Sequence, residues 1–339
     1  MFEPLMQIKD LRIEYPSHFG VVRAVDIPAL DIRKGEVLGL VGESGCGKST
    51  LGMALLRMVR RPGHIAGGQV WFGGRDLVGL SEAEMREIRG RAISMIFQDP
   101  MTSLDPLQRI EEHLVEAIQV HDGTVTRQQA KERIRALMDR LGIAERRLRD
   151  YPHQFSGGMR QRIMIGLALA LNAQLIIADE PTTSLDVIVE AQILDLIKEL
   201  QQAYRLTILL ITHNIGIVAQ LADRVAVMYA GRLVELADAV TFFEHPLHPY
   251  TEDLLASVPN INLSDDKLRI MAGSPPDLIQ PPTGCRFHPR CRCAKERCSR
   301  ETPPFAEVAP GHWIACWPHD AALVEPDATC VTPYEREFK

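Results

Sequence analysis

The sequence predicts an α/β fold built on a parallel sheet, with a helical insertion and a short cysteine-rich extension. Three continuous apolar runs have the composition of strands that are buried on both faces. A glycine-rich loop follows the first run, and a stretch with helical spacing separates the second run from the third. The three runs are Val37–Val41, Leu175–Ala178 and Thr207–Ile211.

Length and composition exclude several classes of protein. A chain of 339 residues predicts two domains, or one large domain with an appendage. Its 46% apolar and 24% charged residues exclude a disordered chain, a collagen-like repeat and a disulfide-dense miniprotein. A net charge of -6 makes a nucleic-acid partner unexpected.

Targeting and membrane segments are not expected either. The first ten residues lack a basic start followed by an apolar core, so no signal peptide is predicted. The most apolar stretch, Ile163–Ala178, is shorter than the ~20 residues that a bilayer requires and contains Asn172 and Gln174. We therefore expect a cytoplasmic protein whose role at a membrane comes through partners.

Helices and turns can be placed around the three strands. After the glycine-rich loop, Thr50–Val59 has the pattern of a helix, and Val187–Tyr204 has helical spacing. Val225–Glu235 is typical of two short strands that turn at Ala230-Gly231.

The middle of the chain is predicted to be helical. Ser81–Glu84 and Thr126–Gln129 both fit the capping box that begins a helix. After the second box, four apolar residues fall on one helical face. They are Ala130, Ile134, Leu137 and Leu141. Residues 100–160 are thus expected to form a helical insertion between strands.

The amino-acid composition of the chain changes from about residue 259. Five prolines mark a linker, Pro259, Pro275, Pro276, Pro281 and Pro282. Six of the seven cysteines follow it, Cys285, Cys291, Cys293, Cys298, Cys316 and Cys330. A reducing cytosol would not maintain disulfides, so this clustering favours a local metal site. We expect one domain over 1–259 and a linker with extension over 260–339, too polar to hold a large core of its own.

The glycine-rich loop fits the pattern G-x-x-x-x-G-K-[ST]. Its residues are Gly42, Glu43, Ser44, Gly45, Cys46, Gly47, Lys48 and Ser49, followed by Thr50. Glycines let backbone N–H groups surround phosphates, and the following helix directs its positive end at them. Lys48 can reach the β- and γ-phosphates, and the Ser49 hydroxyl can bind Mg²⁺. The alternative is a chance glycine-rich turn, but the flanking strand and helix are the context that the motif requires.

A pair of carboxylates follows the second apolar run. Asp179 would reach the Mg²⁺ ion, and Glu180 would lie beside the γ-phosphate, where it could polarise the attacking water. A third segment, Phe155–Arg162, opens with Ser156-Gly157-Gly158, which can form another anion site at the start of a helix.

Taken together, these segments resemble the ATP-binding subunits of ABC transporters. Ser156–Gln161 resembles the signature motif, and Lys48, Asp179 and Glu180 resemble the Walker A lysine, the Walker B aspartate and the catalytic glutamate. The resemblance covers residues 5–235. It implies a RecA-like P-loop core with a small antiparallel β portion, a helical subdomain and a C-terminal extension.

The resemblance assigns further residues. Gln98 corresponds to the Q-loop that contacts Mg²⁺ and the membrane subunits, and His213 to the switch histidine that senses the γ-phosphate. The remaining nucleotide contacts that it implies are Tyr15 on adenine and Ser156, Gly157, Gly158, Gln161 and Asp186. Two positions depart from the common pattern, Ser184 in the D-loop and Asn214 after the switch histidine. These two substitutions affect the expected rate of ATP hydrolysis and not the expectation of hydrolysis itself.

The tail resembles the oligopeptide/dipeptide-importer branch of this family. Phe242–Thr251 and Gly284–Cys291 carry this resemblance. In that branch four cysteines can hold a [4Fe–4S] cluster, which implies Cys285, Cys291, Cys298 and Cys316 here. Four thiolates suit Zn²⁺ equally well, although the lack of a C-x-x-C pair disfavours common zinc ribbons. Cys293 and Cys330 would then be spare thiols.

The resemblance implies an ATPase that powers peptide import from the cytoplasmic face of the inner membrane. Its implied partners are a second ATP-binding subunit, two transmembrane permease subunits and an extracytoplasmic substrate-binding protein. A heterodimer is expected, and a homodimer is the alternative because this chain carries every motif. Alternative cargoes are nickel, oligosaccharides and opine-like solutes. Two other classes of function are kept as alternatives to a transporter subunit. One is a soluble ABC protein that acts in repair or translation, and the other is an iron- or redox-sensing regulator.

Overall fold

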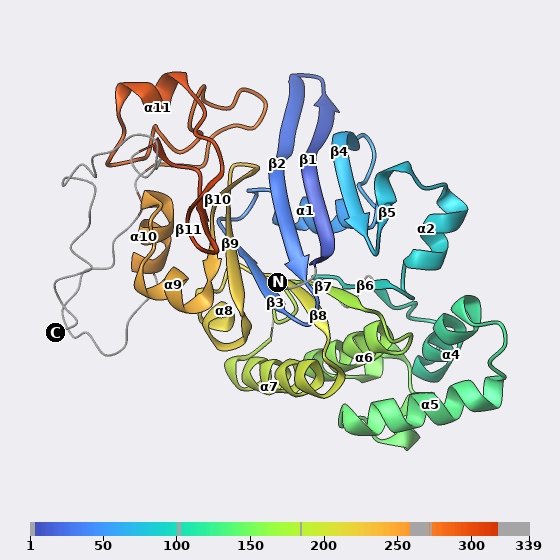
Figure 1. Cartoon of the computed structure of the whole chain (residues 1–339). Coiled ribbons are helices and arrows are strands. Elements are labelled where there is room, and N and C mark those ends of the chain that lie inside the picture. The colour runs from blue at the N-terminus through green and yellow to red at the C-terminus, as the bar shows by residue number, and fades with distance from the viewer. Residues whose placement is uncertain (1–3, 100–102, 184, 258–270, 272, 318–339) are drawn as a thin grey trace. The chain divides into compact units, whose positions relative to one another are not determined.

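The computed structural model describes residues 4–99, 103–183, 185–257, 271 and 273–317 (Figure 1). The chain forms two compact units, each assembled from three separate stretches. The first unit takes the described parts of Met1–Met6, Ile32–Val37 and Phe72–Thr212. The second takes Gln7–Asp31, Leu38–Trp71 and the described parts of His213–Lys339.

The first unit contains three parallel strands. They are β6 (Ile93–Ile96), β7 (Leu175–Asp179) and β8 (Thr207–Ile211). Strand β7 lies between the other two and pairs in parallel with both. Every residue of β7 and β8 is buried, which confirms the prediction of two-sided burial.

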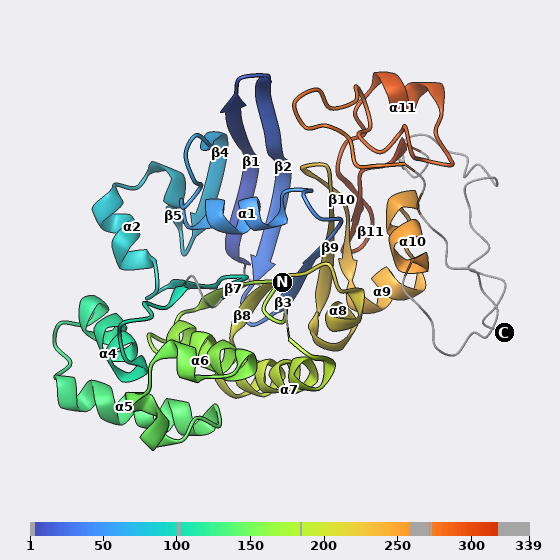
Figure 2. The same ribbon diagram turned by 180° about the vertical axis from the view of Figure 1, so that it is seen from behind.

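Helices occupy the stretch between β6 and β7, as predicted. They are α4 (Ile110–His121), α5 (Arg127–Arg140), the 3₁₀ turns η2 (Glu145–Arg149) and η3 (Pro152–Gln154), and α6 (Gly157–Leu169). Helices α4 and α5 lie side by side in both views (Figure 2). Ala130, Ile134 and Leu141 are buried, whereas Leu137 is half-buried.

Both predicted capping boxes are present in the first unit. Ser81 caps α2 (Glu82–Ile88) and Thr126 caps α5, each with the reciprocal bond from the third helical residue. Helix α7 spans Val187–Tyr204, the predicted range, because Asp186 accepts from Val189 N and thereby fixes its start. The described part of this unit also contains β5 (Arg75–Asp76) and η1 (Leu77–Gly79).

The second unit contains two groups of strands. In the first group β1 (Pro4–Ser17) lies between β2 (Gly20–Arg33) and β4 (His64–Phe72). The two-residue turn between β1 and β2 makes this pair antiparallel, the small antiparallel portion that was expected. The second group contains β3 (Val37–Val41), β9 (Arg224–Tyr229) and β10 (Arg232–Asp238). Strand β9 is parallel to β3 and turns into β10 at Ala230-Gly231, as predicted.

The helices of the second unit are short. They are α1 (Lys48–Leu55), α8 (Ile215–Leu221), α9 (Ala239–Glu244), α10 (Pro249–Ala256) and α11 (Glu296–Arg300). Helix α1 begins at Lys48, before the predicted Thr50, and ends at Leu55, before the predicted Val59. It stops because Arg57 adopts a left-handed φ of 51°, while Met58 N and Arg57 N donate to Met53 O and Ala54 O. This is a Schellman motif with arginine at the position where glycine is usual.

The cysteine-rich extension adds two strands that the sequence did not predict. Strand β12 (His312–Ile314) pairs antiparallel with β10, and β11 (Ala306–Ala309) pairs with β12. Phe287 of the extension is buried in one cluster with Tyr229, Phe242 and Tyr250. The extension therefore shares the core of the second unit, as its polar composition requires. No helix in the described part of the chain combines the length and hydropathy needed to cross a bilayer.

Candidate nucleotide and cysteine sites

The phosphate loop connects β3 to α1 in the second unit. A Cβ at Gly42 would lie 2.1 Å from Met228 O, and one at Gly47 would lie 2.4 Å from Ala24 O. Both glycines also have positive φ values, of 149° and 105°. Close backbone packing and left-handed conformation thus both require glycine at these two positions.

Lys48 begins helix α1 and is buried against the loop. Its ammonium donates to Gly42 O at 2.7 Å and Glu43 O at 3.0 Å. The loop thereby holds a buried positive charge at the N-terminus of α1, next to backbone N–H groups. Cys46 is also buried in the loop, and burial raises the pKa of its thiol.

The carboxylate pair ends strand β7 in the first unit. Asp179 is buried, and Glu180 adopts a left-handed φ of 48°, which is strained for a residue with a side chain. Glu180 N donates to Ile211 O at 2.8 Å. Its Oε2 accepts from Gln98 Nε2 at 3.1 Å and from Thr183 Oγ1 at 2.8 Å. The structure therefore brings together Gln98 and Glu180, two of the predicted catalytic residues.

The signature segment opens helix α6, also in the first unit. Ser156 is the N-cap and accepts from Met159 N at 3.4 Å. A Cβ at Gly158 would lie 2.4 Å from Val189 Cγ1 of α7, so this glycine permits the two helices to approach closely. The buried Gln161 has no hydrogen-bond partner for its Nε2 among the described residues. Ser184 lies outside the described residues.

Two predicted residues lie in the second unit on other segments. His213 is exposed and precedes Asn214, which caps α8 by accepting from Gly216 N at 2.9 Å. Asn and Asp cap helices equally well, so the departure at Asn214 preserves local structure. The half-buried ring of Tyr15 packs against Gly63, where a Cβ would lie 2.3 Å from Tyr15 Cε1. No motif in the sequence indicates this contact, because Gly63 and Tyr15 lie far apart in the chain.

Five cysteines of the extension line one small cavity of about 10 Å³, which holds at most one water. They are Cys285, Cys291, Cys293, Cys298 and Cys316. Burial raises the pKa of Cys285 and raises that of Cys291 to about 12. The cavity thus includes all four predicted ligands together with Cys293, which was expected to be spare. Cys330 lies outside the described residues.

The donor set of this cavity suits a metal in kind, because thiolates bind both Fe–S clusters and Zn²⁺. Its geometry is not that of a formed site. Within the described ranges, no group of three or more His, Cys, Asp or Glu side chains is arranged to hold a metal ion.

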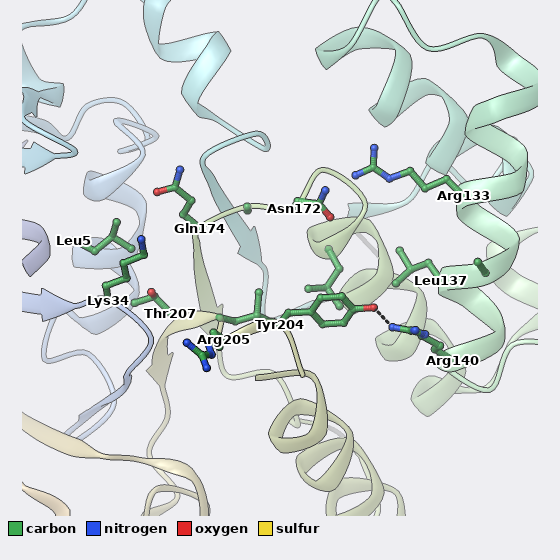
Figure 3. A pocket seen from close by; sticks show the side chains of 14 residues that line it. Leu5, Lys34, Arg133, Leu137, Arg140, Asn172, Gln174, Tyr204, Arg205 and Thr207 are labelled. Atoms are coloured by element: carbon green, nitrogen blue, oxygen red, sulfur yellow. Dashed lines mark hydrogen bonds between the residues drawn. The ribbon is translucent and has the colours of Figure 1, made fainter. Parts of the chain in front are cut away.

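The first unit contains a cavity of about 570 Å³ (Figure 3). Four cations line it, Lys34, Arg133, Arg140 and Arg205. Arg140 donates to the hydroxyl of Tyr204, whose ring it also overlies. None of the predicted catalytic, nucleotide or metal residues lines this cavity, so it carries none of the chemistry described above.

Comparison with known proteins places these sites in a family. A family model described as ABC transporter matches residues 25–183, and one described as the oligopeptide/dipeptide transporter C-terminal region matches residues 234–298. The oligopeptide transport ATP-binding protein OppD of Bacillus subtilis is 44% identical over 98% of this chain and 92% of its own length. The dipeptide transport ATP-binding protein DppD of Lactococcus lactis is 43% identical, over 98% and 94%. The chain belongs to the ABC transporter ATP-binding proteins.

A solved structure supports the fold of this ABC transporter ATP-binding protein. The dimeric structure of MJ0796, a bacterial ABC transporter cassette, has a TM-score of 0.62 and 26% identity and covers 69% of this chain and 98% of its own. The ABC ATPase fold predicted from the sequence is therefore confirmed. The matched C-terminal region includes Cys285, Cys291 and Cys298 and ends before Cys316.

Proposed function

We propose that this chain hydrolyses ATP to drive the import of di- and oligopeptides through a membrane complex. The main support within the first unit is the glutamate Glu180, which two side-chain donors orient, Gln98 and Thr183. The second unit separately contains the phosphate loop with its buried Lys48. The cargo rests on the names of the relatives, which are oligopeptide and dipeptide transport ATP-binding proteins. The ATPase cassette would occupy residues 1–259 and the extension residues 260–339.

The proposed chemistry is a phosphoryl transfer to water. Glu180 accepts a proton from the water as its oxygen forms a bond to the γ-phosphorus, and the bond to the bridging oxygen of ADP breaks. Lys48 would exchange its loop carbonyls for phosphate oxygens. Mg²⁺, when bound, neutralises phosphate charge, and Ser49, Asp179 and Gln98 would hold it. His213 would sense the γ-phosphate, and Tyr15 would stack on adenine.

Assembly follows from the family. Ser156, Gly157 and Gly158 would contact the nucleotide of a second ATP-binding subunit, with Gln161 and Asp186 in the same interface. A heterodimer is our preferred arrangement. Two permease subunits and an extracytoplasmic binding protein would complete the importer, with this chain peripheral on the cytoplasmic face of the membrane.

Uptake in the native host tests the cargo. Labelled di-, tri- and pentapeptides are supplied to the wild type and to a strain in which the chromosomal copy carries Glu180→Gln. We expect the variant to lose uptake of at least one size class. Unchanged uptake of all three would overturn the peptide assignment and favour nickel or a sugar as cargo.

We also propose that the cysteine cavity binds a [4Fe–4S] cluster through Cys285, Cys291, Cys298 and Cys316. The support is that all four thiols line one cavity of the second unit.

Anaerobic purification checks the cluster. The wild-type protein is expected to be brown and to contain iron and sulfide, and Cys298→Ser is expected to lose the colour. Cys46→Ser, which changes a buried cysteine of the phosphate loop instead, should remain brown. A colourless wild-type protein with stoichiometric zinc would contradict the cluster and favour a zinc site.

A further inference from the structure

The phosphate loop contains an acidic residue, which is unfavourable where anionic phosphates bind. Glu43 is the second residue of the loop, and Lys48 donates to its carbonyl oxygen at 3.0 Å. The backbone N–H of Glu43 donates to the hydroxyl of Tyr250 at 2.9 Å. The backbone of Glu43 is therefore held at both its N–H and its carbonyl group. Its carboxylate belongs to the same loop as the Lys48 ammonium, which is expected to bind the phosphates. Its negative charge would oppose phosphate binding unless a cation compensates it.

Arg290 of the extension provides that cation. Its guanidinium donates to Glu43 Oε2 at 2.9 Å and to Oε1 at 3.0 Å, a bidentate ion pair. The Arg290 side chain is only 6% exposed and that of Glu43 is 23% exposed, so water screens the pair weakly. Arg290 also donates to Tyr229 Oη at 3.3 Å and lies over the Tyr229 ring. The arginine is thus fixed in place by the core of the second unit.

We propose that Arg290 is a positioning residue for ATP binding: it neutralises Glu43 and holds the phosphate loop in its binding conformation. The inference rests on the proposed function, because it assumes that the loop binds nucleotide. It gives the extension a part in the nucleotide site, through a residue outside every motif of the cassette. Arg290 acts through Glu43 and touches neither the nucleotide nor a reacting atom.

The extension offers a matched control at Arg292. This arginine also lies in the extension and forms ion pairs with two carboxylates, Glu252 and Asp253 of α10. Neither pair involves the phosphate loop. Arg292→Gln therefore removes a comparable charge without altering the environment of Glu43.

The test measures the dissociation constant of the full chain for Mg-ATP in four proteins. They are the wild type, Arg290→Gln, Arg292→Gln and the double variant Glu43→Gln/Arg290→Gln. We expect Arg290→Gln to weaken binding at least about tenfold, because one partner of a buried charge pair is removed. Arg292→Gln should bind as the wild type does. The double variant should recover to within about threefold, because the uncompensated carboxylate is gone and the backbone N–H groups remain.

Stability is measured beside binding, because removing both partners also relieves a purely structural defect. The proposed role predicts that ATP-free Arg290→Gln unfolds at a urea concentration close to that of Arg292→Gln and still binds ATP more weakly. A loss of stability that accounts for the loss of affinity would indicate a structural role alone. Arg290→Lys keeps the charge, should show intermediate affinity, and provides the measurement if Arg290→Gln does not fold. Equal binding by the wild type and Arg290→Gln, or an unrescued double variant, would overturn the inference alone. A wild type that binds no ATP would overturn the proposed function itself.

Discussion

Replacement of Glu180 by glutamine is expected to lower steady-state ATP hydrolysis at least about a hundredfold in the assembled complex while ATP binding remains intact. Glutamine cannot accept the proton of the attacking water. Its carbonyl oxygen can still accept from Gln98 and Thr183, the two donors that orient Glu180. The left-handed backbone is unchanged in character, since both residues bear a Cβ. The substitution therefore removes the proton acceptor and keeps the local hydrogen bonds and backbone of residue 180.

Phosphate release and nucleotide binding, measured separately on the same preparation, check this expectation. Glu190→Gln is the matched control. Glu190 lies on the neighbouring helix α7, and its half-buried carboxylate accepts from Thr182 Oγ1 at 2.8 Å. Its turnover should stay near that of the wild type. Normal hydrolysis by Glu180→Gln would contradict the role of Glu180 as general base.

Replacement of Glu235 by alanine is expected to destabilise the second unit by about 3–5 kcal/mol. This carboxylate on β10 is fully buried. It accepts from Leu247 N at 2.8 Å, from His248 N at 3.0 Å and from His312 Nε2 at 2.7 Å. Alanine would leave all three donors without an acceptor in a site that water does not reach.

Urea unfolding, monitored by the fluorescence of the tryptophans, measures this loss of stability, because Trp71, Trp313 and Trp317 all belong to the second unit. The control is Glu307→Ala on β11, an exposed carboxylate that accepts from Gly311 N in the local turn. Its cost should stay below about 1 kcal/mol. If Glu235→Ala and Glu307→Ala were equally stable, Glu235 would not join the extension to the sheet.

The strands and the helix α7 could be predicted because their signals are local. A strand buried on both faces is a continuous apolar run, and Asp186 is a capping residue directly before a helical pattern. Helix α1 was predicted too long because its end depends on the left-handed Arg57, where no glycine marks the stop. Strands β11 and β12 were missed because they are short and depend on pairing with β10.

The predicted site residues came from motifs, and each motif is a short stretch of sequence. The ion pair of Glu43 with Arg290 joins positions far apart in the chain, and no periodicity links them. One signal was available, namely an acidic residue in a loop that should bind anions. The inclusion of Cys293 in the cysteine cavity likewise depends on how the extension folds, since only the family resemblance favoured Cys291 over its near neighbour.

The two strands contributed by the extension also bear on how the protein avoids aggregation. Five consecutive residues of β10, 233–237, are buried, and all but Glu235 are apolar. Without β12 this strand would be a largely apolar sheet edge with unpaired backbone groups. Such an edge is a template for strands of other chains. With the extension in place, the outermost strand beside β12 among the described residues is the four-residue β11, which carries the exposed Glu307. A short, charged edge resists strand addition, so the extension protects the cassette from self-association independently of what its cysteines bind.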